Sequence, residues 1–211
     1  MFKDDGELDR DFISKACGVF KRYAAEGNWL VVVVGGGLPA KKAADQARAT
    51  GLSDYYADKA AIQATRENSA ILLKALGKDA APAFNDIDEA LPLLEKGKIV
   101  VSNGMHPGLT TDSVSVLFAE AIGADRVVNV SNTDGVYDSD PRTNPKAKRF
   151  DKLSHQQLID LAIKFDERKA RTNFVFDLVA CKLAARSKIR ILFTSKKKFE
   201  SLDDVQGTAV G

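Results

Sequence analysis

Three consecutive glycines at residues 35–37 follow an apolar run and precede a segment with helical spacing. Glycine lets the backbone approach a ligand closely, and amides at the start of a helix carry a partial positive charge. A phosphate suits such a turn, although a tight turn without a ligand is the alternative for these residues alone. The Walker A pattern is absent, and the dinucleotide pattern G-x-G-x-x-A fits weakly, because Asp58 follows no second apolar strand.

A second segment, residues 104–112, combines flexible backbone with an imidazole, His106, and two adjacent hydroxyls, Thr110 and Thr111. Hydroxyls beside the free amides of a helix start suit a phosphate, and N-capping by one threonine is the alternative. We do not expect His106 to act as a base, because phosphoryl transfer depends on positioning and charge neutralisation more than on proton abstraction.

A third segment, residues 131–141, is polar and contains carboxylates, an amide and an aromatic ring. Asp134 and Gly135 form a turn signal, but the whole segment is too long for a simple connector, which favours a function. In this segment Tyr137 could flank a base, and Asp140 could accept a hydrogen bond from a ribose or an amino group.

Each of these segments follows a short apolar run, which is typical of a parallel strand covered on both faces. The expected strands span residues 29–34, 98–102, 126–130 and 189–193. Helical spacing marks residues 12–23, 39–49, 62–76, 87–94, 110–123, 155–163 and 175–185. Such alternation predicts an α/β fold, a three-layer α/β/α sandwich with a mainly parallel central sheet. Ligands of such sheets bind at the carboxyl ends of the strands, where the three segments lie.

The composition of the 211 residues, 45% hydrophobic and 28% charged, indicates a soluble globular protein. A net charge of +2 gives no reason to expect nucleic acid or membrane binding, and no signal peptide is expected, since the N-terminus is charged from Lys3 onward. Cys17 and Cys181 are expected to be core residues in a reducing cytoplasm. Zinc is disfavoured, because the chain has no C-x-x-C pair and only two histidines.

Residues 104–145 resemble the amino acid kinase family. They contain Pro-Gly-x-Thr-Thr-Asp, Gly-Ala-Asp, Asn-x-Asp-Gly-Val-Tyr and Asp-Pro in that order. Residues 105–111, together with Gln-Ala-Thr-Arg-Glu-Asn at residues 63–68, look specifically like the archaeal type of UMP kinase. The resemblance extends over residues 29–211 and, more loosely, over the first helix.

The resemblance implies transfer of the γ-phosphate of ATP, with Mg²⁺, to UMP. It implies one domain, in which about residues 1–115 bind the acceptor and about residues 116–211 bind ATP. The implied UMP contacts are Gly36, Asp58, Met105, His106, Pro107, Gly108, Leu109, Thr110 and Thr111. The implied ATP contacts are Gly37, Lys41, Ser131, Asn132, Tyr137 and Asp140. Lys182 matches a lysine that neutralises the transferring phosphoryl group, and no residue is assigned to a metal. A cytoplasmic homohexamer is implied as well.

The chain departs from the family pattern in three places. Lys41 stands where arginine is expected, which keeps the charge but loses the bidentate fork, and Ser131 stands where threonine is usual. The family begins with a buried strand and a glycine-rich turn, and Met1 is expected to lie beyond that strand.

Three alternatives stay open. A nucleotide-binding or storage relative without catalysis would fit the missing strand. An isopentenyl phosphate kinase would need a histidine near residues 35–37, where none occurs. A dinucleotide oxidoreductase rests only on the weak glycine pattern.

Overall fold

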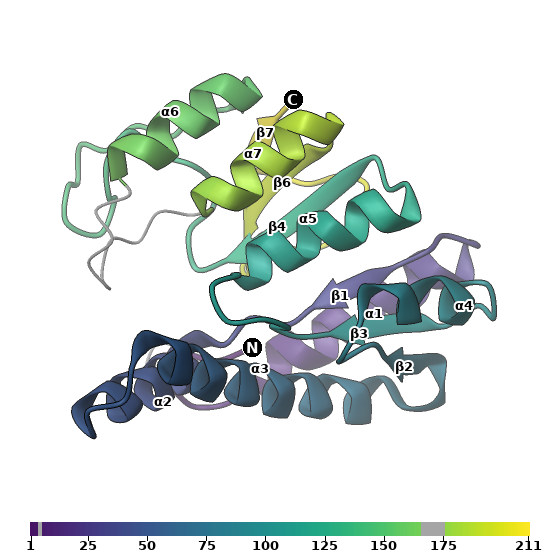
Figure 1. Cartoon of the computed structure of the whole chain (residues 1–211). Coiled ribbons are helices and arrows are strands. Elements are labelled where there is room, and N and C mark those ends of the chain that lie inside the picture. Colours follow the sequence, from purple (N-terminus) through teal and green to yellow (C-terminus); the bar gives the residue numbers. More distant parts are fainter. Residues whose placement is uncertain (4–5, 166–175) are drawn as a thin grey trace. The chain divides into compact units, whose positions relative to one another are not determined.

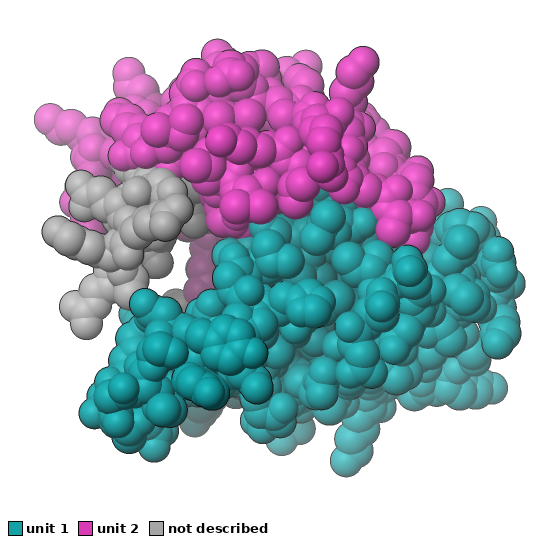
Figure 2. All heavy atoms as spheres, viewed as in Figure 1, with its two compact units in different colours: residues 1–118 teal, residues 119–211 magenta. Residues whose placement is uncertain are grey.

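A computed structural model describes residues 1–3, 6–165 and 176–211 of the chain (Figure 1). The chain divides into two compact units, Met1–Phe118 and Ala119–Gly211, which are coloured teal and magenta in Figure 2. Each unit carries its own sheet and is described by itself.

The first unit contains a three-stranded parallel sheet of order β1-β3-β2, formed by β1 (Val31–Val33), β3 (Ile99–Ser102) and β2 (Ala80–Pro82). The central strand β3 is buried along its whole length, as its apolar sequence predicts. The expected strand at residues 29–34 is shorter and only half-buried, because β1 pairs with β3 alone among the described strands. The edge strand β2 was not predicted; its Pro82 has no N–H to donate, which an edge position tolerates.

Helices of the first unit follow the predicted spacing, with one large difference. They are α1 (Arg10–Ala25), α2 (Gly37–Ala49), α3 (Asp54–Leu76) and α4 (Ala90–Leu94), with short 3₁₀ turns η1 (Gly77–Asp79) and η2 (Ile87–Glu89). The difference is α3, which begins at Asp54 instead of residue 62. Its first turns lack large buried apolar residues, and the α2–α3 contact is built from alanines: Ala44, Ala47, Ala57, Ala60 and Ala61. Side chains this small let two helices approach closely, but they do not produce the pattern of large apolar residues from which a helix is predicted.

The second unit contains a four-stranded sheet of order β4-β6-β7-β5, with β4 (Arg126–Ser131), β6 (Arg190–Ser195), β7 (Thr208–Val210) and β5 (Lys152–Leu153). The β4–β6 and β5–β7 pairs are parallel, and β6–β7 is antiparallel. The strands β4 and β6 confirm the expected runs, whereas β5 and β7 were not predicted.

The remaining helices are α5 (Thr111–Ile122), α6 (His155–Phe165) and α7 (Leu178–Ser187). A capping box starts α6: Gln157 N donates to Ser154 Oγ at 3.2 Å, and Ser154 N donates to Gln157 Oε1 at 2.8 Å. Asp177 accepts hydrogen bonds from Val179 N and Ala180 N and so sets the start of α7. The expected start, residue 175, lies outside the described residues.

The α/β class with mainly parallel strand pairing is therefore confirmed, with the strands divided between two sheets. Cys17 and Cys181 are both free and buried, which confirms them as core residues. Among the described helices, none is both long enough and apolar enough to cross a membrane.

Candidate functional site

The glycine turn (residues 35–37) connects the end of β1 to the start of α2. A Cβ on Gly36 would lie 2.2 Å from the Cβ of Ala40, so no other residue fits there without a shift of the helix. Gly37 has a φ of +56°, in the left-handed region that favours glycine. Glycine is therefore required at two of the three positions, at Gly36 by the close approach of Ala40 and at Gly37 by its φ angle.

Helix α3 holds this turn from one side. The side-chain amide of Asn68 donates from Nδ2 to the carbonyl oxygens of Gly35 and Gly36, both at 3.1 Å. Asn68 is only 3% exposed, so these bonds are shielded from water. No described residue accepts a hydrogen bond from the N–H of Gly36 or Gly37. The turn is thus fixed through its carbonyls while its amides stay available.

The same helix holds the 104–112 segment. Gly104 N donates to Thr65 Oγ1 at 3.0 Å, and Gly108 N donates to Asp58 Oδ2 at 2.8 Å. Asp58, Thr65 and Asn68 are spaced by seven and three residues, which places them on one face of α3. The structure therefore joins two predicted acceptor contacts, Asp58 and Gly108.

The two threonines at the start of α5 differ in what they do. Thr110 is the N-cap, because its Oγ1 accepts from Ser113 N at 3.2 Å. Thr111 is the first helical residue, and its Oγ1 would lie 3.7 Å from a Cβ placed on Gly35. Thr111 thus faces the glycine turn, while His106 is exposed.

The other predicted acceptor residues of this segment are less tightly placed. Met105, Pro107 and Leu109 are partly buried, and Leu109 N donates to His106 O at 3.1 Å to close a turn. The segment is therefore a compact turn whose exposed tip is formed by His106 and Gly108.

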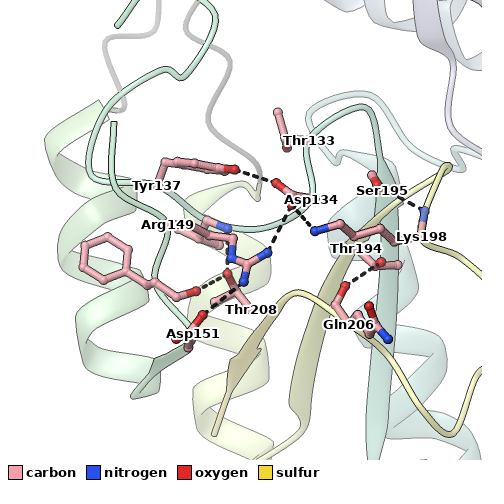
Figure 3. Close-up of polar contacts among 12 residues, drawn as sticks. Thr133, Asp134, Tyr137, Arg149, Asp151, Thr194, Ser195, Lys198, Gln206 and Thr208 are labelled. Carbon is pink, nitrogen blue, oxygen red and sulfur yellow. Dashed lines mark hydrogen bonds and ion pairs between the residues drawn. The ribbon is translucent and has the colours of Figure 1, made fainter. Parts of the chain in front are cut away.

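In the second unit, the 131–141 segment is organised around Asp134 (Figure 3). Its carboxylate accepts from Tyr137 Oη at 2.5 Å, from Arg149 Nη1 at 3.1 Å and from Lys198 Nζ at 2.6 Å. Burial by itself raises the pKa of Asp134, but the hydrogen bonds from Lys198 and Tyr137 and the charges of Lys198 and Arg149 outweigh it and lower the pKa to about 2. The hydrogen bond to this carboxylate, with burial, raises the pKa of Tyr137.

Two glycines let this segment pack closely against the sheet. A Cβ on Gly135 would lie 2.5 Å from Thr208 Oγ1, and one on Gly207 would lie 1.7 Å from the carbonyl oxygen of Phe193. Val136 N donates to Thr208 Oγ1 at 2.9 Å. The close packing at these glycines and the contacts of Asp134 together determine the conformation of residues 131–141.

The four predicted ATP contacts of this segment lie within it. Ser131 Oγ donates to Thr133 O at 3.0 Å at the end of β4, and Asn132 is exposed beside it. The hydroxyl of Tyr137 is directed at Asp134, and both carboxylate oxygens of Asp140 accept from the Arg142 guanidinium at 3.0 Å. The structure therefore pairs Asp140, expected to face a nucleotide, with a neighbouring cation.

The two predicted cationic residues are exposed, Lys41 on α2 and Lys182 on α7. Within residues 1–3, 6–165 and 176–211, neither forms a hydrogen bond or an ion pair. Both ammonium groups are therefore accessible to an anion.

Sequence reasoning included Thr65 and Asn68 in the motif at residues 63–68 but gave them no role, and it missed Arg149 and Lys198. Asn68 and Thr65 are polar residues inside an otherwise buried helical face, and that anomaly was a usable signal. The sequence contained no comparable signal for Arg149 and Lys198, because they contact Asp134 from 15 and 64 residues away along the chain. The described residues contain no cluster of three or more histidine, cysteine or acidic side chains that could hold a metal ion.

Comparison with known proteins gives consistent matches over nearly the whole chain. The sequence profile described as "Amino acid kinase family" matches residues 2–195. The uridylate kinase of Thermococcus onnurineus is 41% identical over 206 residues, 97% of this chain and 90% of the relative, and that of Methanocaldococcus jannaschii is 39% identical over 94% and 88%.

Solved structures give the same picture. The crystal structure of uridylate kinase from Archaeoglobus fulgidus superposes with a TM-score of 0.81 at 34% identity, covering 96% of this chain and 94% of that chain. UMP kinase from Ureaplasma parvum has a TM-score of 0.81 at 21% identity, over 100% of this chain and 93% of that one, which shows a shared fold.

Proposed function

Since the chain belongs to the amino acid kinase family, we propose that it is a nucleoside monophosphate kinase that transfers the γ-phosphate of ATP to UMP, giving ADP and UDP. The observation that carries this proposal is the 41% identity, over 97% of the chain, to an archaeal protein named uridylate kinase. The site described above supports it with groups suited to two phosphorylated ligands.

The first unit supplies the contacts for the acceptor. The amides of Gly36, proposed to contact UMP, and Gly37, proposed to contact ATP, have no acceptor among the described residues and stand at the start of the 13-residue helix α2, where the helix dipole also favours an anion. UMP would place its phosphate near this turn, and the segment fixed by Asp58 would cover its nucleoside. Such fixed amides align two mutually repelling anions before reaction, which is the main task in phosphoryl transfer.

The second unit supplies the contacts for ATP in this proposal. Ser131, Asn132, Tyr137 and Asp140 line the segment after β4 and would hold the nucleotide. Lys182 would neutralise the transferring phosphoryl group, and Lys41 of the first unit would contact the ATP phosphates. In-line transfer forms a bond from a UMP phosphate oxygen to the γ-phosphorus while the bond to the β-phosphate bridging oxygen breaks, and ADP leaves.

Magnesium is proposed to enter with ATP. The carboxylates of Asp134 and Asp140 are engaged by cationic side chains, so phosphate oxygens and water fit as its main ligands better than a protein cage. When bound, Mg²⁺ would neutralise charge on the phosphates.

A homo-oligomer, a hexamer by resemblance, is also proposed. Three large side chains, Leu52, Tyr55 and Tyr56, are 48–55% exposed around the start of α3, which supports a contact surface in this region. Light scattering on the purified protein measures the assembly; a monomer at micromolar concentration would contradict it.

The function is tested by ADP release with ATP, Mg²⁺ and a panel of UMP, CMP, AMP and isopentenyl phosphate. We expect UMP to give the highest kcat/KM. Turnover of isopentenyl phosphate alone would contradict the proposed acceptor. Stabilisation by ATP without any turnover would instead identify a nucleotide-binding relative.

A further inference from the structure

The side-chain amide of Asn68 has two hydrogens and contacts two consecutive carbonyl groups, those of Gly35 and Gly36. Each distance is 3.1 Å, and the side chain is almost fully buried. Both Nδ2 hydrogens are thus accounted for by the glycine turn. Neither aspartate, which has no donor when ionised, nor leucine, which has the same shape without polar atoms, can make this pair of bonds.

The two carbonyls determine where two amides point. In a planar trans peptide, the C=O of one residue and the N–H of the next point in opposite directions. The carbonyl of Gly35 therefore fixes the N–H of Gly36, and the carbonyl of Gly36 fixes the N–H of Gly37. Because both carbonyls face Asn68 on α3, both amides face away from α3.

Asn68 is the only described side chain that holds these two peptides; the Gly36 carbonyl also accepts from Ala40 N, at the longer distance of 3.3 Å, whereas the Gly35 carbonyl accepts from Asn68 alone among the described residues. No described residue accepts from either N–H, and no side chain caps the start of α2, where Gly36 is the N-cap. Gly36 and Gly37 also lack side chains whose packing could hold the peptide planes. Without the Asn68 bonds, the Gly35 carbonyl would have no described partner and the Gly36 carbonyl only the bond from Ala40 N. Rotation of either peptide would turn an N–H away and present a carbonyl oxygen to the ligand, which repels a phosphate.

We propose that Asn68 is a positioning residue, which aims the Gly36 and Gly37 amides at the phosphate groups of the two substrates through a single side-chain amide. The inference rests on the proposed function, in which Gly36 contacts UMP and Gly37 contacts ATP. One buried group of α3 then sets the geometry of a donor contact and an acceptor contact together.

The matched control is Ser69, the next residue of the same helix. It is 0% exposed, and its single Oγ hydrogen lies within reach of two carbonyl oxygens, Thr65 O at 2.9 Å and Ser102 O at 2.8 Å. Ser69→Ala removes this buried donor, which links α3 to β3, and removes no contact of the glycine turn. The Ser69→Ala variant therefore shows how much stability is lost when a buried polar side chain of α3 next to Asn68 is removed.

The kinetic test compares Asn68→Ala, the same-sized Asn68→Asp, and Ser69→Ala, each assayed at a temperature where circular dichroism shows it folded. We expect both Asn68 variants to lower kcat about a hundredfold, the size of effect found when an oriented donor is removed, with KM for UMP and ATP raised less than tenfold. Ser69→Ala should change kcat less than threefold. Equal kcat for Asn68→Ala and Ser69→Ala would overturn the inference.

A second measurement does not depend on turnover. The protein, labelled with ¹⁵N-glycine, is titrated with UMP and, separately, with ATP, and the amide resonances of Gly36 and Gly37 are followed. In the wild type and in Ser69→Ala, the Gly36 resonance should move with UMP and the Gly37 resonance with ATP. Both should stay in place in Asn68→Ala, and movement there would overturn the inference. If wild-type protein fails to phosphorylate UMP, the proposed function fails, and the titration still decides the role of Asn68. If Asn68→Ala does not fold, Asn68→Asp replaces it in both measurements.

Discussion

The glycine turn of the first unit and the 131–141 segment of the second are both held by side chains distant in sequence, but by different chemistry. The turn is fixed by the neutral side-chain amide of Asn68 on α3, and Thr65 of the same helix fixes Gly104 in the neighbouring segment; the two side chains are 3% and 5% exposed. The segment is fixed by an ionic network in which the side chain of Asp134 is 25% exposed and that of Lys198 is 41% exposed.

This difference has physical consequences for each region. Buried neutral hydrogen bonds do not titrate and are insensitive to salt, so the glycine turn should keep its shape over a wide range of conditions. Half-exposed ion pairs weaken with salt and with protonation of the carboxylate. The 131–141 segment should therefore respond to pH more strongly than the glycine turn.

The largest effect is expected from Lys182 of the second unit and Lys41 of the first, which are exposed and have no hydrogen-bond or ion-pair partner among the described residues. Lys182→Ala should lower kcat about a thousandfold, about 4 kcal/mol of transition-state stabilisation, with ATP affinity changed less than threefold. Lys41→Ala should mainly raise KM for ATP, about tenfold, because its charge contacts phosphates in the ground state as well. Steady-state kinetics and nucleotide titration separate the two outcomes.

The adjacent exposed lysine of α2, Lys42, provides the matched control, and Lys42→Ala should behave as wild type. A kcat of Lys182→Ala within threefold of wild type would remove Lys182 from the site. In that case no cationic residue of the second unit would remain as a proposed contact of the transferring phosphoryl group.

The next effect concerns the ionic network alone. Asp134→Ala leaves the donors of Tyr137, Arg149 and Lys198 without their shared acceptor and should lower the free energy of unfolding by about 3 kcal/mol. Asp151→Asn is the control, because that carboxylate also contacts Arg149 but its side chain is 85% exposed, and it should cost less than about 1 kcal/mol. Urea unfolding followed by circular dichroism measures both. Equal losses would mean that burial of the network contributes nothing.

A smaller effect follows from the pKa of Asp134, which is lowered to about 2 in the folded protein. An unfolded aspartate has a pKa of about 3.9, so the ionised carboxylate stabilises the fold at higher pH and this contribution is lost as pH falls from about 4 toward 2. The lost contribution is about 2 kcal/mol. The contacts of Asn68 and Thr65 contain no group that titrates in this range.

Urea midpoints of wild type and Asp134→Asn at pH 5, 4, 3 and 2.5 test this directly. The stability difference between the two proteins should shrink as the pH falls, because protonation removes in the wild type what the substitution already removed. A constant difference would show that the carboxylate does not titrate in the network.

These two regions also show what the sequence could and could not predict. Local signals in the sequence marked the glycines at residues 35–37, which can be recognised without knowing their partners, and the strands β3, β4 and β6, which are apolar runs. The strands β2, β5 and β7 have two or three residues each, too few to form a pattern, and they exist because a neighbouring strand pairs with them.

The contacts that hold the two regions in place were also hard to predict, because they too depend on residues that are distant in sequence. Asn68 reaches Gly35 across 33 residues, and Lys198 reaches Asp134 across 64, so neither partner could be named before the chain was folded. A polar residue on a buried helical face still indicates that some partner exists. A lysine near the end of the chain indicates nothing comparable, since exposed lysines are common.

The smallest effects are expected from two neighbouring threonines at the start of α5, one of which should affect stability and the other binding. Thr110→Ala removes the N-cap bond to Ser113 N and should cost about 1 kcal/mol of unfolding free energy, while Thr110→Ser should retain it. Thr111→Val keeps the shape of the side chain. Because Thr111 is not the N-cap, the substitution should change the free energy of unfolding by less than about 0.5 kcal/mol. Its lost hydroxyl faces Gly35, and KM for UMP should rise about tenfold. A stability loss in Thr111→Val that equals that of Thr110→Ala, with unchanged KM, would reassign this hydroxyl from the ligand to the fold.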